Sequence, residues 1–443
     1  MGIKNYKNSL LKTFPNIITR KVPKDIHTLC IDLNSILHKV CPRSNNNLDF
    51  KKNLINSINK IIKKIKPKKR LAIFTDGQAV LAKAKLQIKR RNKHLYSTSS
   101  GISSLNLTPC TPFMVSLDKI ILTYLASLSI DTYYSSSKKN NEGELKLFNW
   151  LHNNNINDTT CIVGSDSDLI VLAVANSPLI NMYIYNDKSF ISIFKLVEKL
   201  SYFVPSKFNL KWHPVRQDFV LMSLFQGNDY NKRISNFDKL LNAYSKLQKK
   251  KEGFLINKNK VINLKSVKKL LQKINVTNKK PCSVIDVCNY FESLQWNLNL
   301  YYNKINSQYI PSYNNINIYS ILKYIPNKVN IINPNDNWLN WKVYLLLLMP
   351  IVGKKLVPNE IKKLMDEDSP IKDLFPEPCL ECIDWKKKLS QLIPPDNNAD
   401  DEVVKKYREF SSKINCAYSN HIQKSHIIKD LPIQRIQEAV SKI

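Results

Sequence analysis

The sequence predicts an α/β protein built on a mostly parallel β-sheet that is flanked by helices. Two observations lead to this fold class. Short apolar segments that read as buried strands alternate with longer segments that carry apolar residues at helical spacing. Aspartates stand where several of these strands end. Strands and helices that alternate in this way form parallel sheets, because each helix returns the chain to the start of the next strand.

Four segments are predicted as strands because they are short and apolar: residues 27–32, 71–75, 161–164 and 180–185. Asp32 ends the first strand and Asp76 follows the second. Asp166 and Asp168 follow the third. Ligands of parallel sheets bind beyond the carboxyl ends of the strands. We therefore expect these four aspartates at one edge of the sheet.

The spacing of apolar residues predicts helices over residues 50–66, 79–94, 113–129, 142–152 and 218–225. Composition divides the chain further, and 443 residues are enough for several domains. Residues 1–240 carry the α/β pattern, and residues 241–280 are lysine-rich and predicted as a basic linker or arm. Residues 281–395 are expected to form a second, mainly helical region, and residues 396–443 a helical tail.

The net charge is +33, from 68 Lys and Arg against 35 Asp and Glu, which points to a polyanionic partner. Compositional drift toward Lys, Asn and Ile explains many lysines, but it does not explain why acids gather at a few places. The chain has no apolar run of about 18 residues and no apolar signal region at its start. We expect a soluble, intracellular protein that makes no membrane contact.

Nine cysteines are scattered along the chain, which indicates reduced thiols and not a disulfide framework. Cys379 and Cys382 form the only close pair. A zinc site would need a second pair or nearby histidines at ligand spacing. The sequence near the pair offers neither, so we expect no structural metal there.

Seven acids stand out on this basic chain: Asp32, Asp76, Glu142, Glu144, Asp166, Asp168 and Asp229. One aspartate at a strand end often caps the next helix, but four of these acids form two i, i+2 pairs at turns. Neighbouring carboxylates raise one another's pKa unless a cation neutralises them. Hard oxygen ligands suit Mg²⁺ or Mn²⁺, and two ions about 3.5–4 Å apart would clamp a phosphodiester. We expect all seven acids to bind metal.

A basic segment follows Asp76. Lys83, Gln87, Arg90 and Arg91 are spaced to share one face of a helix. Arginine forks and a lysine charge suit a terminal phosphate dianion, although a solvated basic face would have the same spacing. His38 lies six residues after Asp32 and is a candidate to stack on a nucleic-acid base, with a structural histidine as the alternative.

These residues together resemble motifs of the Xrn family of 5′→3′ exoribonucleases. The motifs that carry the resemblance in the first half are Asp32-Leu-Asn-Ser-Ile-Leu-His38, Asp76-Gly, Ala82-Lys83, Arg90-Arg91, Thr108-Pro-Cys-Thr-Pro-Phe-Met114, Glu142-Gly-Glu-Leu-Lys146, Gly164-Ser-Asp-Ser-Asp-Leu-Ile170 and Gly227-Asn-Asp-Tyr230. Further similar segments are Leu294-Gln-Trp-Asn-Leu298, Leu356-Val-Pro, Leu364-Met, Ser369-Pro-Ile and Phe375-Pro. The similarity covers most of residues 1–395.

The resemblance implies a PIN-like 5′-nuclease core in residues 1–240, with a second region that braces the active site and narrows its entrance. It implies that the seven acids hold two Mg²⁺ or Mn²⁺ ions. It also implies that Lys83, Gln87, Arg90 and Arg91 bind a 5′-monophosphate and that His38 stacks on the first base. The expected activity is degradation of single-stranded RNA from its 5′ end to mononucleotides, in RNA decay, by a monomer.

The sequence departs from the family pattern at three places. Asn141 and Leu145 flank the Glu-Gly-Glu motif where the family has Gly and His. Tyr309 stands in the stretch where the family has a tryptophan that stacks against the histidine. The long C-terminal modules of cytoplasmic members and the zinc knuckle of some nuclear members are absent from the sequence.

Two other function classes are considered. A flap-type 5′ DNA nuclease shares the acids and the α/β core, but its duplex-binding element needs a Gly-rich hairpin after the last acid, where this chain has only Gly253 and Gly353. An RNA-binding scaffold with a decayed site would have lost some acids, and none is missing. The basic run Lys63–Arg70 resembles a nuclear localisation signal but also spans a helix end and a strand start, so nucleus and cytoplasm are not distinguished.

Overall fold

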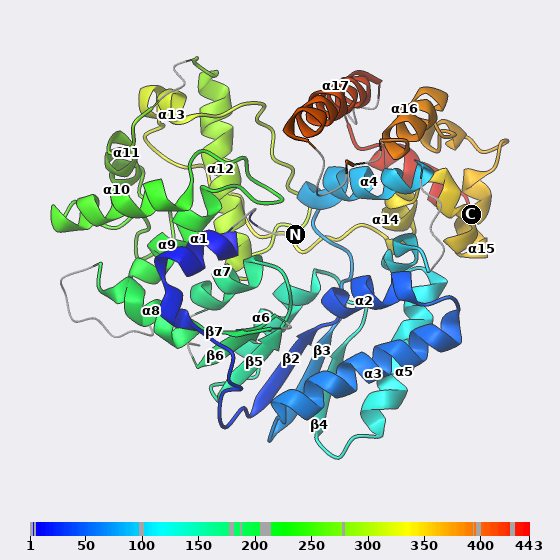
Figure 1. Ribbon diagram of the computed structural model, residues 1–443, viewed down its shortest axis with the longest axis horizontal. Helices are drawn as coiled ribbons and strands as arrows, with labels where there is room; N and C mark the ends of the chain where they lie inside the picture. Colours follow the sequence, from blue (N-terminus) through cyan, green and yellow to red (C-terminus); the bar gives the residue numbers. More distant parts are fainter. Residues whose placement is uncertain are drawn as a thin grey trace. The chain divides into compact units, whose positions relative to one another are not determined.

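The computed structural model is shown in Figure 1. It describes residue 3 and residues 6–96, 102–176, 181–186, 188–203, 214–276, 280–392, 394–395, 400–425 and 430–443. The chain folds into two compact units, which are treated separately below. Unit 1 comprises Met1–Lys83 and Val115–Trp338, and unit 2 comprises Ala84–Met114 and Leu339–Ile443.

Unit 1 contains a seven-stranded sheet with the order β1-β7-β6-β5-β2-β3-β4 (Figure 1). The strands in that order are β1 (Ile18–Thr19), β7 (Phe190–Ser192), β6 (Met182–Tyr185), β5 (Thr160–Val163), β2 (Thr28–Asp32), β3 (Arg70–Phe74) and β4 (Asp131–Ser135). The five strands from β6 to β4 are parallel, and β7 and β1 are added antiparallel at one edge. The predicted α/β class with a mostly parallel sheet is confirmed. Of the predicted fourth strand, residue 180 lies outside the described residues.

The strand order creates a switch point between β2 and β5. From β2 the chain adds β3 and then β4 on one side, and it later returns to place β5 on the other side of β2. Asp32 is paired in register with Phe74 of β3, and Ile31 is paired with Val163 of β5. Crevices at such switch points, outside the carboxyl ends of the strands, are where open α/β sheets bind ligands.

The central strands are apolar along their whole length because both faces of the sheet are covered. Every residue of β5 is buried, as are all of β2 except Asp32 and all of β3 except Arg70. Helix α6 packs against β2 and β3, while α7 and α8 pack against β6. Continuous apolar runs are what parallel strands need when helices cover both sides.

The helices of unit 1 are α1 (Tyr6–Thr13), α2 (Asn34–Val40), α3 (Asn47–Ile65), α5 (Pro112–Ala126, mostly in this unit), α6 (Gly143–Asn153), α7 (Asp168–Ala175), α8 (Ile193–Ser201), α9 (Pro214–Leu224), α10 (Phe237–Lys249), α11 (Leu264–Gln272), α12 (Val284–Tyr301) and α13 (Ile318–Tyr324). Short 3₁₀ turns are η1 (Pro15–Ile17), η2 (Cys41–Arg43) and η3 (Leu81–Lys83). The helix predicted over residues 50–66 is observed as α3, which begins three residues earlier than predicted. Asn46 caps its first turn by accepting from the Asp49 amide, and Lys66 leaves the helix at φ 53° just before Pro67.

Residues 241–280, for which the sequence predicted a basic linker or arm, contain the end of α10 and all of α11. Leu255, Ile256 and Ile262 belong to the main apolar core of unit 1. The buried carboxylate of Asp218 accepts from the backbone amides of Leu255 and Ile256 at 2.8 and 3.0 Å. The many lysines of the segment hid its apolar residues, which alternate with lysines along an amphipathic helix.

Unit 2 is helical in its described residues. Its elements are α4 (Ala84–Asn92), η4 (Lys93–Tyr96), η5 (Ser104–Leu107), α14 (Trp341–Leu348), η7 (Ile351–Leu356), α15 (Asn359–Lys362), η8 (Lys363–Met365), η9 (Lys372–Leu374), α16 (Leu380–Ser390), α17 (Asp401–Ser425) and α18 (Ile433–Val440). The apolar helix α14 packs against α4 and α18, and α16 packs against α17. Within the described residues, no helix is both long and apolar enough to cross a membrane.

Candidate active site

All seven acids singled out by the sequence lie in unit 1. Asp32 ends β2 and Asp76 follows β3, so both stand at the carboxyl edge of the sheet. The others stand at the starts of helices or in loops: Glu142 is the N-cap of α6, Glu144 lies in its first turn, Asp166 follows β5, Asp168 begins α7, and Asp229 follows α9.

Asp32 and Asp76 converge on the N-terminus of α6. The Gly143 amide donates to Oδ1 of Asp76 at 2.6 Å. A Cβ atom on Gly143 would lie 3.2 Å from Oδ1 of Asp76 and 3.4 Å from Oδ1 of Asp32, so a glycine leaves room for both carboxylates. The partial positive charge of a helix N-terminus stabilises such anions.

Asn34 connects the same two aspartates, and the sequence analysis did not assign it a role. Its side-chain amide donates to Oδ2 of Asp76 at 2.6 Å, and its Oδ1 accepts from the Asp76 amide at 3.1 Å. Its own backbone amide donates to Oδ1 of Asp32 at 3.2 Å. A polar residue two positions after a strand-end aspartate was the available signal. Asn34 therefore fixes the orientation of both carboxylates.

Lys83 lies among the acids. Its ammonium pairs with Glu142 and, at 3.0 Å, with Asp229, and only 12% of its side chain is exposed. Tyr230 donates to the second oxygen of Glu142 at 2.8 Å, and its ring lies 5.9 Å from the Lys83 nitrogen. Burial alone would lower the pKa of Lys83, but attraction to Glu142, Tyr230 and Asp229 outweighs it and holds that pKa well above its ordinary value. Lys83 is therefore a fixed positive charge.

The carboxylates lie buried or half-buried next to one another, and this perturbs their titration. Burial, with repulsion from Asp76, raises the pKa of Asp32 to about 8. Burial, with repulsion from Asp166, raises the pKa of Asp168 to about 8. The pKa of Glu144 is raised well above its ordinary value by burial and then by Asp166 and Asp168. Such shifts mean that the protein's own positive charges do not compensate the ionised form of these carboxyl groups at neutral pH.

The residues fit hydrated divalent cations. A cation is the usual remedy for buried carboxylates that repel one another, and oxygen ligands select Mg²⁺ or Mn²⁺. In the described part of the chain, no three of these carboxylates have oxygens within 4.8 Å of one another. Mg²⁺ keeps several waters and binds through few carboxylates per ion, so it does not require three carboxylates that close together.

The predicted phosphate-binding residues divide between the two units. Lys83 ends η3 in unit 1, whereas Gln87, Arg90 and Arg91 lie on α4 in unit 2. Within unit 2, Arg91 donates to Oε1 of Gln87 at 2.6 Å and to Oγ1 of Thr108 at 2.9 Å. Helix α4 begins at Ala84, so the start of the single helix predicted over residues 79–94 was wrong.

The reason for the late start of α4 lies in the residues before it. The Gly77 amide donates to the Asn141 carbonyl at 2.9 Å, and the Asn141 amide donates to the Gln78 carbonyl at 2.7 Å. These bonds hold residues 77 and 78 alongside the turn before α6, outside any helix. Asn141 has φ 85°, a left-handed conformation that favours glycine and is tolerated by asparagine. This explains how asparagine serves where the Xrn pattern has glycine.

Two further residues from the sequence analysis have defined positions in unit 1. His38 lies in the last turn of α2, the helix that follows Asp32. Tyr309 packs its ring against Trp296 of α12, with 5.0 Å between the ring centroids. Leu145, at the position where the family has histidine, is buried in the core.

From the sequence, only the two cysteines of one further group were recognised. In unit 2, His421 of α17 reaches Cys379 and Cys382 at the start of α16, and the three ligand atoms lie within 4.8 Å of one another. The expectation of no structural metal at the cysteine pair rested on a search near the pair. The histidine lies on the next helix, so it could have been found only by looking further along the sequence.

A comparison with known protein families finds a match in the first part of the chain. The family model described as "XRN 5'-3' exonuclease N-terminus" matches residues 1–102 and 92–187. Residues 1–187 are an Xrn-family N-terminal domain. All of the candidate acids except Asp229 lie within this Xrn domain, as do Lys83, Gln87, Arg90, Arg91 and His38. The matched residues are 187 of the 443 residues of the chain.

Two solved structures are similar to this chain at low sequence identity. A bacteriophage T5 D15 protein co-crystallised with metal ions is 9% identical, covering 62% of this chain and 86% of that one, with a TM-score of 0.35. The catalytic core of Rad2 in complex with DNA is 11% identical, covering 73% of this chain and 92% of that one, with a TM-score of 0.36. No curated protein matches the chain significantly.

Proposed function

We propose that this chain is a divalent-metal-dependent 5′→3′ exoribonuclease. It would degrade single-stranded RNA from a 5′-monophosphate end, release mononucleotides and act as a monomer in RNA decay. The observation that carries the proposal is the group of buried, mutually repelling carboxylates at the carboxyl edge of the sheet in an Xrn domain. The net charge of +33 supports a polyanionic substrate.

The seven acids are proposed as the metal ligands: Asp32, Asp76, Glu142, Glu144, Asp166, Asp168 and Asp229. When bound, two Mg²⁺ ions supply an activated water and stabilise the leaving oxygen of a phosphodiester. Asn34 holds Asp32 and Asp76 in place through its side chain and its amide. The α6 N-terminus at Gly143 stabilises the charge of Asp76.

Lys83 is proposed to have two roles, one before the substrate binds and one toward the phosphate of the bound substrate. Its pairing with Glu142 and Asp229 neutralises part of the carboxylate charge before substrate arrives. Its raised pKa keeps it protonated, so it can donate to a phosphate oxygen but cannot act as a base. Lys83 therefore binds phosphate and holds the carboxylates of Glu142 and Asp229 in position.

The 5′-phosphate is proposed to be bound by Lys83, Gln87, Arg90 and Arg91. Arginine guanidinium groups present planar pairs of donors that match the oxygens of a phosphate dianion. A site that requires a terminal phosphate makes the enzyme an exonuclease, because the first phosphodiester then lies at a fixed distance from the end. His38 is proposed to stack on the first base.

The test compares four substrates in Mg²⁺: RNA with a 5′-monophosphate, RNA with a 5′-triphosphate, capped RNA and flap DNA. We expect rapid release of mononucleotides from the monophosphorylated RNA only, and loss of activity in an Asp166→Ala/Asp168→Ala variant. Equal degradation of monophosphorylated and capped RNA would contradict the phosphate site. Preferred cleavage of flap DNA would replace RNA decay by a DNA-processing role.

A further inference from the structure

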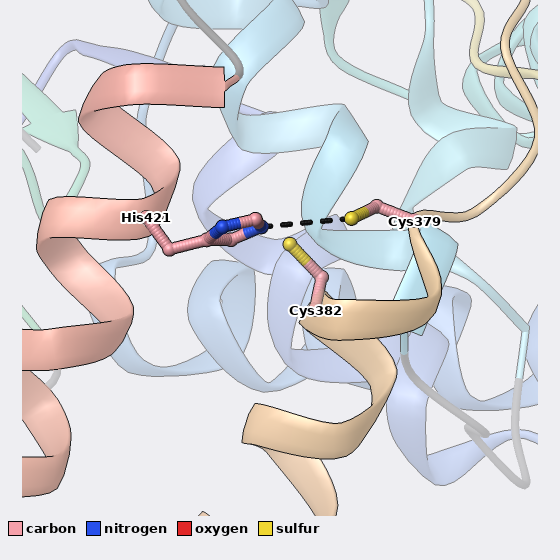
Figure 2. A group of neighbouring side chains, drawn as sticks. All are labelled: Cys379, Cys382 and His421. Carbon is pink, nitrogen blue, oxygen red and sulfur yellow. Dashed lines mark hydrogen bonds between the residues drawn. The ribbon is translucent and has the colours of Figure 1, made fainter.

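Three side chains with metal-binding atoms converge in unit 2, where α16 packs against α17. Figure 2 shows Cys379 and Cys382 at the start of α16 and His421 on α17 pointing toward one another. Cys379 is the N-cap of α16, and Cys382, in its first turn, is fully buried. The Sγ atom of Cys379 lies 3.5 Å from Nε2 of His421.

The distance between the ligand atoms of Cys379 and His421 matches a tetrahedral zinc site. Zinc bonds of about 2.3 Å to sulfur and about 2.05 Å to nitrogen, at the tetrahedral angle, place the two ligand atoms about 3.5 Å apart. The observed Cys379–His421 separation is 3.5 Å. A thiol–imidazole hydrogen bond has a similar length, but it needs only one cysteine, and here the Cys382 sulfur joins the same group.

Glu381 supplies a separate indication of a metal site. Its Oε2 lies 2.8 Å from Nδ1 of His421. A carboxylate in that place accepts a hydrogen bond from Nδ1–H. In the neutral imidazole, Nε2 is then the unprotonated nitrogen, and it faces the Cys379 sulfur. Histidines that ligate zinc commonly have such a carboxylate behind them, because it fixes the ring and its tautomer.

Over residues 401–421, helix α17 has no buried apolar face of the kind that normally holds a helix in place. None of residues 401–421 is buried, and Val403 and Phe410 are 50% and 58% exposed. A helix with so little buried surface gains little from the hydrophobic effect. A metal bound by side chains of both helices would supply the missing attachment, since metal binding contributes directly to folding.

We propose that Cys379, Cys382 and His421 bind a zinc ion that fastens α17 to α16. Two thiolates and an imidazole form a donor set that suits zinc and does not suit Mg²⁺. The site is therefore separate in chemistry from the carboxylates of unit 1, and it does not depend on the proposed nuclease function.

The first experiment measures zinc in the purified full-length chain by mass spectrometry of the metal. We expect a single zinc ion per chain, lost in Cys379→Ser and in His421→Ala. The matched control is Cys416→Ser, which removes an exposed thiol from α17 itself and should leave zinc unchanged. Replacement of zinc by Co²⁺ should give the absorption of a tetrahedral thiolate complex.

A second measurement uses the unaltered chain, so it does not depend on whether the variants fold. Hydrogen exchange of α17 amides is compared with and without a zinc chelator. We expect faster exchange in α17 after zinc removal, reversed by added zinc, with α14 unchanged. A chain that binds no zinc, a Cys379–Cys382 disulfide in its place, or equal zinc loss in Cys416→Ser would overturn the proposal.

Discussion

Replacing Lys83 by methionine tests whether the carboxylates of unit 1 are desolvated as a group. The side chains of Lys83, Glu142 and Asp229 are 12%, 10% and 12% exposed, and the change would leave both carboxylates without their cation. Breaking a buried ion pair by removing one partner costs about 3–5 kcal/mol. We therefore expect Lys83→Met to unfold at clearly lower urea concentration in the presence of a metal chelator.

The same variant should recover most of this loss in Mg²⁺, because bound cations neutralise the carboxylates that Lys83 pairs with. The assay is urea unfolding followed by fluorescence, with and without Mg²⁺. The matched control is Lys273→Met, which removes a partly buried partner of Glu252 in the same unit and should show no Mg²⁺ dependence. A loss for Lys83→Met that is equal with and without Mg²⁺ would refute the reasoning, since Lys83 and metal would then not share ligands.

Three more predictions follow from the same geometry. Burial raises the folded-state pKa of Asp32 from 3.8 to about 8, so the metal-free chain should lose stability as pH rises through that interval. For the same reason, the Mg²⁺ concentration needed for activity should fall as pH rises toward about 8. A Mg²⁺ requirement that does not vary with pH would contradict this. Arg90→Ala should lower kcat/KM on 5′-monophosphate RNA by roughly 10- to 100-fold, which corresponds to the loss of one charged hydrogen bond. The variant should also no longer discriminate against 5′-hydroxyl RNA. Unchanged end preference would mean that α4 presents only a solvated basic face. Gly143→Ala should weaken Mg²⁺ affinity, because its Cβ would lie 3.2 Å from Asp76 and 3.4 Å from Asp32; unaltered Mg²⁺ titration would show that the carboxylates have room to move.

The sequence by itself was sufficient for features that depend on local pattern. The strands β2, β3, β5 and β6 and the helix α3 were predicted because apolar residues repeat at the period of each element, and because Pro67 follows the end of α3. The positions of Asp32 and Asp76 at strand ends followed from the same pattern. Alternation of strands and helices also determined that most of the sheet is parallel.

Lysine-rich composition misled the prediction in one region. Residues 241–280 fold against the core, because a few apolar residues such as Leu255 and Ile262 are enough to bury one face of a segment whose other face is lysine. Composition averages over both faces, whereas burial depends on one of them.

Only the tertiary structure decided which distant residues meet. No local pattern gives the strand order that places β5 beside β2, the pairing of Lys83 with Glu142 and Asp229, or the approach of His421 to the cysteine pair. These contacts join residues far apart in sequence, and their geometry is set by the packing of whole elements. The carboxylates could be chosen from the sequence because strand ends share an edge, but the charge that balances them could be identified only once the fold was known.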